Sequence, residues 1–523
     1  MLMTSKKYKF TFIDLFSGIG GFKMALESNS GKCLGFSEIN TDAISTYCEN
    51  FNESSDENLG DIKKIKELPS HDLLTAGVPC QSWSIAGKNL GFDDDRGQLW
   101  NDTIYLLQQS KPKAFIFENV KGLVDPRNKE ALGYILKRIK QAGYYADYHV
   151  INSHDYGVPQ NRIRVYIIGF KSEEHFLNFA IPSSVKEKIK LSDVLGVSVP
   201  EEESSALQKD LFGEIIPLKS MSLSSSNGIN DYFLFNDLRN GDTTIHSWDI
   251  LSTTARQKDI CYLLLKNRRK KLYGKLDGNP LSLENFQSLD SSIKLSEINK
   301  LIDLEILKEE EYLFSIEKYD ESCLSKEELI ILDYSENGYL NIDTLKSEKS
   351  LRVKRIKIKD TFNTLKEKNI VKCCEIRYDF KNTKISTGLF GVNRIFLPTS
   401  NVFPTLVASD TNDYVTDKFI DTQSPKELKK WFLKNIYKKD GYRKITKEEA
   451  CLIQGFPDTF LLPQTRARWM KLIGNSVSVP VIEKLCEAII ESGAFEKPHK
   501  INKHLTRHLK QGLALSRASN SGL

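Results

Sequence analysis

The residue best suited to chemistry is Cys80, in the loop Gly77–Ser84 (GVPCQSWS) that directly follows the apolar run from His71 to Ala76. A loop at the carboxyl end of a buried strand lies where open α/β sheets bind their ligands. A thiolate in such a loop is a candidate nucleophile for covalent catalysis. An isolated cysteine is more often an inert core residue, so the neighbouring elements decide between the two interpretations.

Three further side chains are predicted to lie beside Cys80. Glu118 ends an apolar run, and Arg162 and Arg164 lead into the apolar run Val165–Phe170. Arginines two residues apart in an extended chain point the same way. Purely structural interpretations also exist: Glu118 could cap a helix, and Arg164 could form an ion pair at the start of a strand. A thiol, a carboxyl group and two guanidinium groups gathered at one sheet edge instead predict an active site.

A cofactor site is indicated by Asp14–Phe22 (DLFSGIGGF), a strand that ends in a glycine-rich turn and leads into a helix. Glycines allow the backbone to approach a ligand closely, and a helix N-terminus offers unpaired N–H groups. Glu38, at the end of the next strand, suits ribose hydroxyls, and Asp61 suits an adenine amino group. A glycine-rich turn alone is weak evidence. The three features together predict an adenosine-bearing cofactor without identifying it.

The elements that must position these groups alternate short apolar runs with helix-like stretches, the pattern of a parallel sheet covered by helices. The predicted strands are Lys9–Leu15, Cys33–Phe36, Leu73–Ala76, Ala114–Phe117 and Val165–Phe170. The predicted helices follow Asn40 and cover Lys129–Ala142, Thr446–Gln454 and Val479–Ile490. The sequence therefore predicts an α/β fold with a doubly wound, mostly parallel sheet.

The 523 residues favour more than one globular body. We predict a first part of the catalytic and cofactor-binding domain over residues 8–170 and an inserted domain over 171–400. Within the insertion, Leu and Ile at roughly helical spacing in Ser291–Leu324 suggest a helical or winged-helix-like module at about 285–395. Residues 401–490 would return to the catalytic domain, and 497–523 would form a basic C-terminal tail.

Composition sets broad limits on the class of protein. The hydrophobic fraction of 40% is sufficient for packed cores, and the net charge of +5 is compatible with a polyanionic partner without requiring one. The nine cysteines lack the paired spacing of zinc ligands, so we expect reduced thiols and no metal site. No segment reads as a signal peptide or a membrane span. We therefore expect a soluble, cytoplasmic protein.

The ordered motifs DLFSGIGGF, GVPCQSWS, FENV, QNRIR, QGFPD and GNSV resemble those of the bacterial cytosine-C5 DNA methyltransferases of restriction–modification systems. The resemblance covers Tyr8–Phe170 and about Arg443–Ile490. It implies the S-adenosylmethionine-dependent methyltransferase fold and S-adenosylmethionine as the cofactor. The residues implied at the cofactor site are Phe16, Gly18, Gly20, Glu38, Ile39, Asp61, Ile62, Leu99, Asn475 and Ser476.

The same resemblance implies that Cys80, Glu118, Arg162 and Arg164 surround a cytosine that has been flipped out of duplex DNA. Cys80 would attack C6 of the base, and the inserted domain would recognise the target sequence. Candidate DNA-binding residues are Gln81 and Ser82 beside the flipped base, and Lys266, Arg268 and Arg269 in a basic run. The other interpretation of this run is an ordinary solvent-exposed charged surface.

Other interpretations remain open. A tRNA cytosine methyltransferase would keep the chemistry and change the substrate, but the long insertion argues against it. A non-catalytic DNA-binding protein does not explain the retention of Cys80, Glu118 and Arg164. A methyltransferase for small molecules does not explain the Pro-Cys loop. We expect a monomer acting on double-stranded DNA, with a separately encoded restriction endonuclease as a possible partner.

Overall fold

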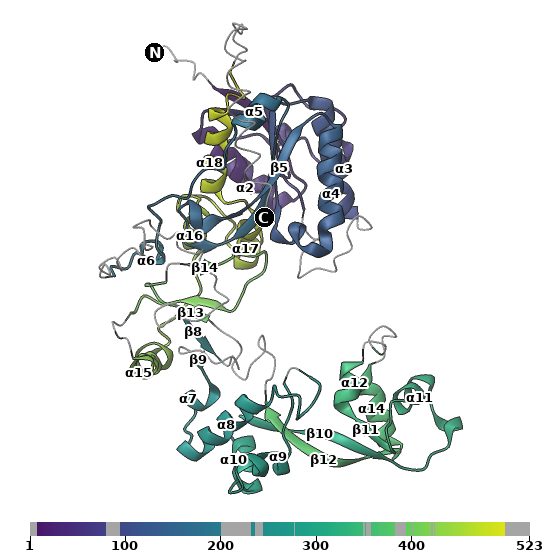
Figure 1. Ribbon diagram of the computed structural model, residues 1–523. Helices are drawn as coiled ribbons and strands as arrows, with labels where there is room; N and C mark the ends of the chain where they lie inside the picture. Colours follow the sequence, from purple (N-terminus) through teal and green to yellow (C-terminus); the bar gives the residue numbers. More distant parts are fainter. Residues whose placement is uncertain are drawn as a thin grey trace, which may run out of the picture. The chain divides into compact units, whose positions relative to one another are not determined.

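The computed structural model describes residues 8–79, 95–199, 232–235, 244–276, 278–348, 351, 357–381, 394–400, 402–419, 422 and 424–496. The chain forms two compact units. Unit 1 comprises Met1–Leu223, Asn401–Thr411 and Ile445–Leu523, and unit 2 comprises Ser224–Ser400 and Asn412–Lys444. No helix within the described ranges has both the length and the apolar character needed to cross a membrane. Figure 1 shows the elements of both units.

Unit 1 is built on a six-stranded sheet of order β2-β1-β3-β4-β7-β5. The first four strands in this order are parallel, β7 is antiparallel to β4, and β5 is antiparallel to β7. The strand bounds are β1 Phe10–Leu15, β2 Gly31–Ser37, β3 Leu73–Gly77, β4 Ala114–Val120, β5 Tyr145–Asn152 and β7 Ile163–Phe170. The predicted α/β fold with a mostly parallel sheet is confirmed.

Burial explains which strands could be predicted. Nearly every residue of β3 and β4 is buried, so these strands read as continuous apolar runs. The edge strand β5 is mostly exposed and mixes polar with aromatic residues, and the sequence analysis did not identify it. Pairing with β7 along its whole length, and not an apolar pattern, defines this strand.

Helices cover both faces of the sheet (Figure 1). On one face, Trp100 and Ile104 of α3 and Ile135 of α4 pack into the same core as Phe115 and Phe117 of β4. On the other face, α1 packs against α18. The helices of unit 1 are α1 Gly21–Ser28, α2 Thr41–Phe51, α3 Asp95–Ser110, α4 Lys129–Gln141, α5 Glu173–Asn178, α6 Leu191–Leu195, α16 Lys447–Gln454, α17 Arg466–Asn475 and α18 Val479–Glu491.

Unit 2 has its own sheets and cores. One sheet has the order β11-β10-β12 and the other β15-β13-β8-β9. The strands are β8 Tyr232–Phe235, β9 Thr244–Ile245, β10 Leu307–Ile316, β11 Tyr339–Asn341, β12 Val371–Phe380, β13 Arg394–Phe396 and β15 Asp413–Val415. The helices are α7 Ser247–Ile250, α8 Ala255–Asn267, α9 Leu283–Leu289, α10 Leu295–Asp303, α11 Lys326–Leu332, α12 Ile342–Ser347, α14 Ile358–Glu367 and α15 Pro425–Asn435.

Three features differ from the sequence-based expectation. Residues 171–199, which we expected in the inserted domain, belong to unit 1, where α5 packs against β5 and β7. The helical spacing predicted over Ser291–Leu324 holds only for α10, because the following residues form β10 and pair with β12 over its whole length. Residues 412–444, which we expected in the returning catalytic domain, belong to unit 2. They do so because β15 pairs with β13, and α15 packs Leu428 and Phe432 against Ile395.

Candidate active site

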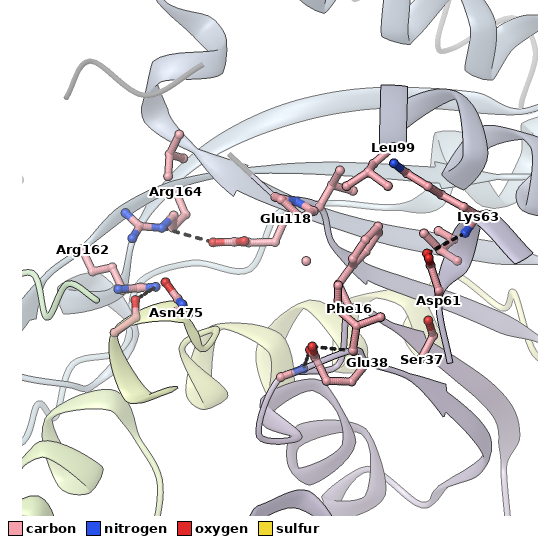
Figure 2. Close-up of a pocket in the computed structure, with 18 residues that line it drawn as sticks. Phe16, Ser37, Glu38, Asp61, Lys63, Leu99, Glu118, Arg162, Arg164 and Asn475 are labelled. Atoms are coloured by element: carbon pink, nitrogen blue, oxygen red, sulfur yellow. Dashed lines mark hydrogen bonds and ion pairs between the residues drawn. The ribbon is translucent and has the colours of Figure 1, made fainter. Parts of the chain in front are cut away.

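A cavity of about 450 Å³ in unit 1 opens where β1, β2, β3 and β4 end. Its volume falls within the range of small-molecule sites. All but two of the predicted cofactor residues line it, as do the three described catalytic candidates (Figure 2). The lining cofactor candidates are Phe16, Gly18, Glu38, Ile39, Asp61, Ile62, Leu99 and Asn475.

At one end of the cavity, the backbone holds the Glu38 carboxylate in place. One oxygen accepts the Gly18 N–H at 2.9 Å, and the other accepts the N–H groups of Ile39 and Asn40, each at 2.8 Å. Gly18 has φ 54°, and a side chain built there would meet no atom within 4 Å. The turn after β1 is therefore bent toward Glu38 and leaves open space above it.

At the Glu38 end of the cavity, a second carboxylate lies near an exposed apolar side chain. The Asp61 carboxylate accepts the Lys63 N–H at 3.0 Å and so begins the 3-10 turn Ile62–Lys64. The side chain of Ile39 borders the cavity although it is 72% exposed. A carboxylate next to uncovered apolar surface is suited to a ligand with a flat apolar face and hydrogen-bonding edges.

At the other end, Glu118 and Arg164 form an ion pair with Oε1 and Nε 3.2 Å apart. The antiparallel pairing of β4 with β7 brings them together, because Val120 lies opposite Arg164 and Glu118 opposite Tyr166. Burial raises the pKa of Glu118, and the positive charges of Arg164 and Arg162 oppose that rise. This carboxyl group is therefore suited to carrying a proton.

Cys80, Gln81 and Ser82 lie outside the described residues. The three residues before Cys80, Gly77, Val78 and Pro79, line the same cavity as Glu118. Asn119, which the sequence analysis did not select, is buried and donates its amide N–H to the Val78 carbonyl at 3.1 Å. The signal that could have identified Asn119 is its position next to Glu118 at the end of β4.

Arg162 lines the cavity, as predicted, and it also makes structural contacts that the sequence analysis did not predict. Its guanidinium donates to the carbonyl oxygens of Leu406 at 2.9 Å, Gly474 at 3.2 Å and Ser476 at 2.7 Å, and the residue is 2% exposed. It borders the cavity, but these bonds hold the returning C-terminal part of the chain beside it. Ser476 accordingly contributes a carbonyl to Arg162 and does not line the cavity.

Two glutamines complete this attachment and were missed by sequence reasoning. Gln160 donates to the Ile453 carbonyl and to the Gln454 side chain, both at 2.9 Å, and Gln454 donates to the Ser476 carbonyl at 2.9 Å. Both glutamines are fully buried. Their position in the QNRIR and QGFPD motifs was the available signal, but the partners lie far apart in sequence.

Gly20 also differs from its predicted role. It is the N-cap of α1 with φ 88°, and a Cβ built there would lie 2.3 Å from the Phe51 ring. Gly20 does not line the cavity. A larger residue would not fit there, because α1 begins directly against the aromatic side chains of α2.

In unit 2, the predicted DNA-binding arginine Arg268 is buried and paired with Asp379, at 3.0 Å between Nη1 and Oδ1. A guanidinium held in this way is unavailable to a base edge. Lys266 and Arg269, the other two candidates in this run, are exposed.

The chain is similar to known proteins over most of its length. A family described as "C-5 cytosine-specific DNA methylase" matches residues 10–491. The chain is 39% identical over 485 residues to Type II methyltransferase M.HgiBI of Herpetosiphon aurantiacus, covering 92% of this chain and 97% of that protein. It is 30% identical over 506 residues to Type II methyltransferase M.NlaIV of Neisseria lactamica, covering 92% and 99%. A solved structure of the Entamoeba histolytica methyltransferase EhMeth matches with TM-score 0.44 and 15% identity over 92% of this chain and 98% of that one.

Proposed function

Since the chain belongs to the C-5 cytosine-specific DNA methylase family, we propose that it methylates C5 of a flipped-out cytosine in duplex DNA through a covalent adduct with Cys80. The methyl donor is S-adenosylmethionine. The observation that carries the proposal is the buried Glu118–Arg164 pair, which shares one cavity with the Glu38 and Asp61 carboxylates and with Pro79, the residue before Cys80.

The residues at the Glu38 end fit an adenosine-bearing donor. Glu38 can accept ribose hydroxyls while its backbone bonds fix its orientation. Asp61 can accept from the adenine amino group, and the exposed face of Ile39 can pack against the ring. Gly18 leaves space for the remainder of the molecule. When bound here, S-adenosylmethionine supplies the electrophilic methyl group.

The groups at the Glu118 end fit the activation of cytosine. The Cys80 thiolate adds to C6, and the negative charge that develops toward N3 and O2 of the ring requires stabilisation. Protonated Glu118 donates to N3, and Arg164 lies next to it for the charge at O2. C5 then takes the methyl group as the donor's sulfur–methyl bond breaks, which leaves S-adenosylhomocysteine. Water takes the C5 proton, the N3 proton returns to Glu118, and elimination of the Cys80 thiolate restores the C5–C6 double bond and releases 5-methylcytosine.

Unit 2 is proposed as the target-recognition domain, with Lys266 and Arg269 contacting DNA. Its helix α15 supports this role. Lys426, Lys430 and Lys434 are exposed at four-residue spacing, whereas Leu428 and Phe432 on the opposite side are fully buried. Such a ridge of cations on an anchored helix suits the phosphate backbone. Gln81 and Ser82 are proposed to support the flipped base and the gap it leaves.

The relatives support a proposal for the cellular role of the enzyme. Both relatives described above are Type II methyltransferases. We therefore propose that this enzyme acts in the bacterial cytoplasm as a monomer and protects DNA from a separately encoded restriction endonuclease.

The test is transfer of labelled methyl groups from S-adenosylmethionine to unmethylated duplex DNA, with bisulfite sequencing of the product. Cys80→Ala should abolish incorporation, whereas Cys374→Ala, which removes an exposed thiol of β12, should retain it. Incorporation at C5 within one short motif is the expected result. Methylation of tRNA in place of DNA by the folded wild type would refute the DNA assignment.

A further inference from the structure

The loop between α8 and α9 exposes an apolar side chain among cations. Leu272 is 82% exposed, and Lys270, Lys271 and Lys275 around it are exposed as well. A single exposed leucine is ordinarily unremarkable. Leu272 differs because buried contacts hold the loop that presents it, and because no ion pair involves Lys270, Lys271 or Lys275 among the residues that the structure describes.

The backbone of this loop is held from the inside. The buried side chain of Asn279 donates to the carbonyls of Arg268 at 3.1 Å and Leu276 at 3.0 Å, and it accepts the Leu276 N–H at 3.1 Å. Arg268 anchors the start of the loop through its ion pair with Asp379. The Arg377 guanidinium donates to the Tyr273 carbonyl at 2.6 Å.

These contacts prevent Leu272 from turning inward. Tyr273, the next residue, is 7% exposed and fills the position in the core of unit 2 beside Leu281 and Phe286. Residues 270–273 form a turn, in which the Tyr273 N–H donates to the Lys270 carbonyl at 3.1 Å and places the neighbouring Leu272 on the outside. Leu272 therefore faces solvent as a consequence of the fold and contributes little to the hydrophobic core.

The lysines around Leu272 differ from several other lysines of unit 2 that are held in ion pairs. Lys366 pairs with Glu311 and Lys381 with Glu305, both at 2.6 Å. Among the described residues, no carboxylate lies within ion-pair distance of Lys270, Lys271 or Lys275. Unpaired cations around a fixed apolar tip match duplex DNA, which offers phosphates on both sides of a groove with apolar sugar and base surfaces.

We propose that this loop is a DNA-contacting element in which Leu272 enters a groove of the duplex while Lys270, Lys271 and Lys275 bind the flanking phosphates. The proposal rests on the proposed function of the enzyme. Under this proposal, the buried Arg268 positions the loop and does not itself contact DNA.

The experiment measures binding of the full-length protein to a duplex that contains the methylated motif and to one that lacks it, over a range of salt concentrations. Leu272→Ser should weaken binding to the motif duplex roughly tenfold, as expected for one lost apolar contact. The double variant Lys270→Ala/Lys271→Ala should weaken binding to both duplexes and reduce the slope of log affinity against log salt by roughly 2.

Two control variants separate this effect from general changes of surface. Leu177→Ser removes a leucine that is 52% exposed on α5 of unit 1, beside Glu173 and Glu174. Lys366→Ala/Lys381→Ala removes two paired cations from unit 2. Both should bind DNA as the wild type does, and Leu272→Ser should unfold at the wild-type temperature because its side chain is exposed.

Unchanged DNA affinity and salt dependence in the loop variants of an enzyme that methylates DNA would overturn the loop proposal and leave the proposed function standing. A lower unfolding temperature for Leu272→Ser, or conversion of a dimer to a monomer with DNA binding intact, would also overturn it. Absence of DNA methylation by the wild type would instead refute the proposed function.

Discussion

The two ends of the active-site cavity hold their carboxyl groups in opposite ways. At the cofactor end, Glu38 accepts three backbone N–H groups and keeps one fixed orientation. At the catalytic end, Glu118 is buried, has its pKa raised by that burial, and is paired with the Arg164 side chain. The same residue type is thus held by backbone N–H groups as an oriented acceptor at one end, and at the other is placed where burial favours its protonated form, the basis of its proposed role as a proton donor.

The largest effect is expected for Glu118→Gln, which keeps the shape of the side chain and removes its titratable proton. Methyl transfer should fall by about 10²- to 10⁴-fold, the usual contribution of a positioned acid, with the affinity for S-adenosylmethionine unchanged. The wild type should lose activity as pH rises through the raised pKa of Glu118, because the proton is then lost. An identical pH profile in the two proteins would assign that proton to another group.

The contribution of Glu118 to the free energy of unfolding should fall with rising pH, as the activity does. The folded-state pKa of Glu118 lies above its ordinary value. The contribution of this group to stability is therefore fully present below the ordinary pKa and is lost as pH rises through the folded value.

Arg162→Lys should affect both ends of the cavity together. A lysine cannot donate to the three carbonyls of Leu406, Gly474 and Ser476 from one planar group. We expect a loss of about 3 kcal/mol in the free energy of unfolding, together with weaker cofactor binding and slower transfer. Urea denaturation and binding of S-adenosylmethionine measure these effects. Arg138→Lys, in α4 at a partly buried position, is the matched control.

Glu38→Gln tests the cofactor end alone. The amide retains one acceptor and places a donor group against backbone N–H groups, so the turn after β1 should lose its fixed geometry. The dissociation constant for S-adenosylmethionine should rise roughly 10- to 100-fold, while the rate at saturating cofactor stays near that of the wild type. Isothermal titration calorimetry and single-turnover transfer distinguish the two quantities. A fall in the saturated rate with unchanged affinity would contradict the separation of the two ends.

The smallest effect is expected at Asp14, the penultimate residue of β1, just before the glycine-rich turn. Burial raises the pKa of this carboxyl group to about 8, although a hydrogen bond from Thr75 at 2.9 Å opposes the rise. Because the folded pKa is raised, its stability contribution is present at low pH and is lost as pH rises toward about 8. Asp14→Asn should flatten this dependence in thermal unfolding measured from pH 4 to pH 9. An unchanged slope would show that Asp14 stays ionised in the folded protein.

Unit 1 could be predicted in detail because its functional residues belong to local patterns. A strand, a turn and the start of a helix are adjacent in sequence, so the apolar runs of β1, β3 and β4 indicated both the sheet and the edge at which Glu38, Asp61 and Glu118 lie. Most of the predicted cofactor residues line the cavity for this reason. The exposed edge strand β5 has no such pattern, and only its pairing with β7 defines it.

The parallel sheet, the position of the cavity and the residue types around it could be predicted from local patterns, because short-range periodicity and strand ends encode them. The contacts of the arginines Arg162 and Arg268 could not, because they depend on the folded chain. Arg162 lies 314 residues from Ser476, whose carbonyl it binds, and Arg268 lies 111 residues from Asp379. No local pattern reveals whether a guanidinium faces a ligand or is buried against such a distant partner. That choice depends on which segments the complete fold brings together, and it separates a residue that binds from one that holds the structure in place.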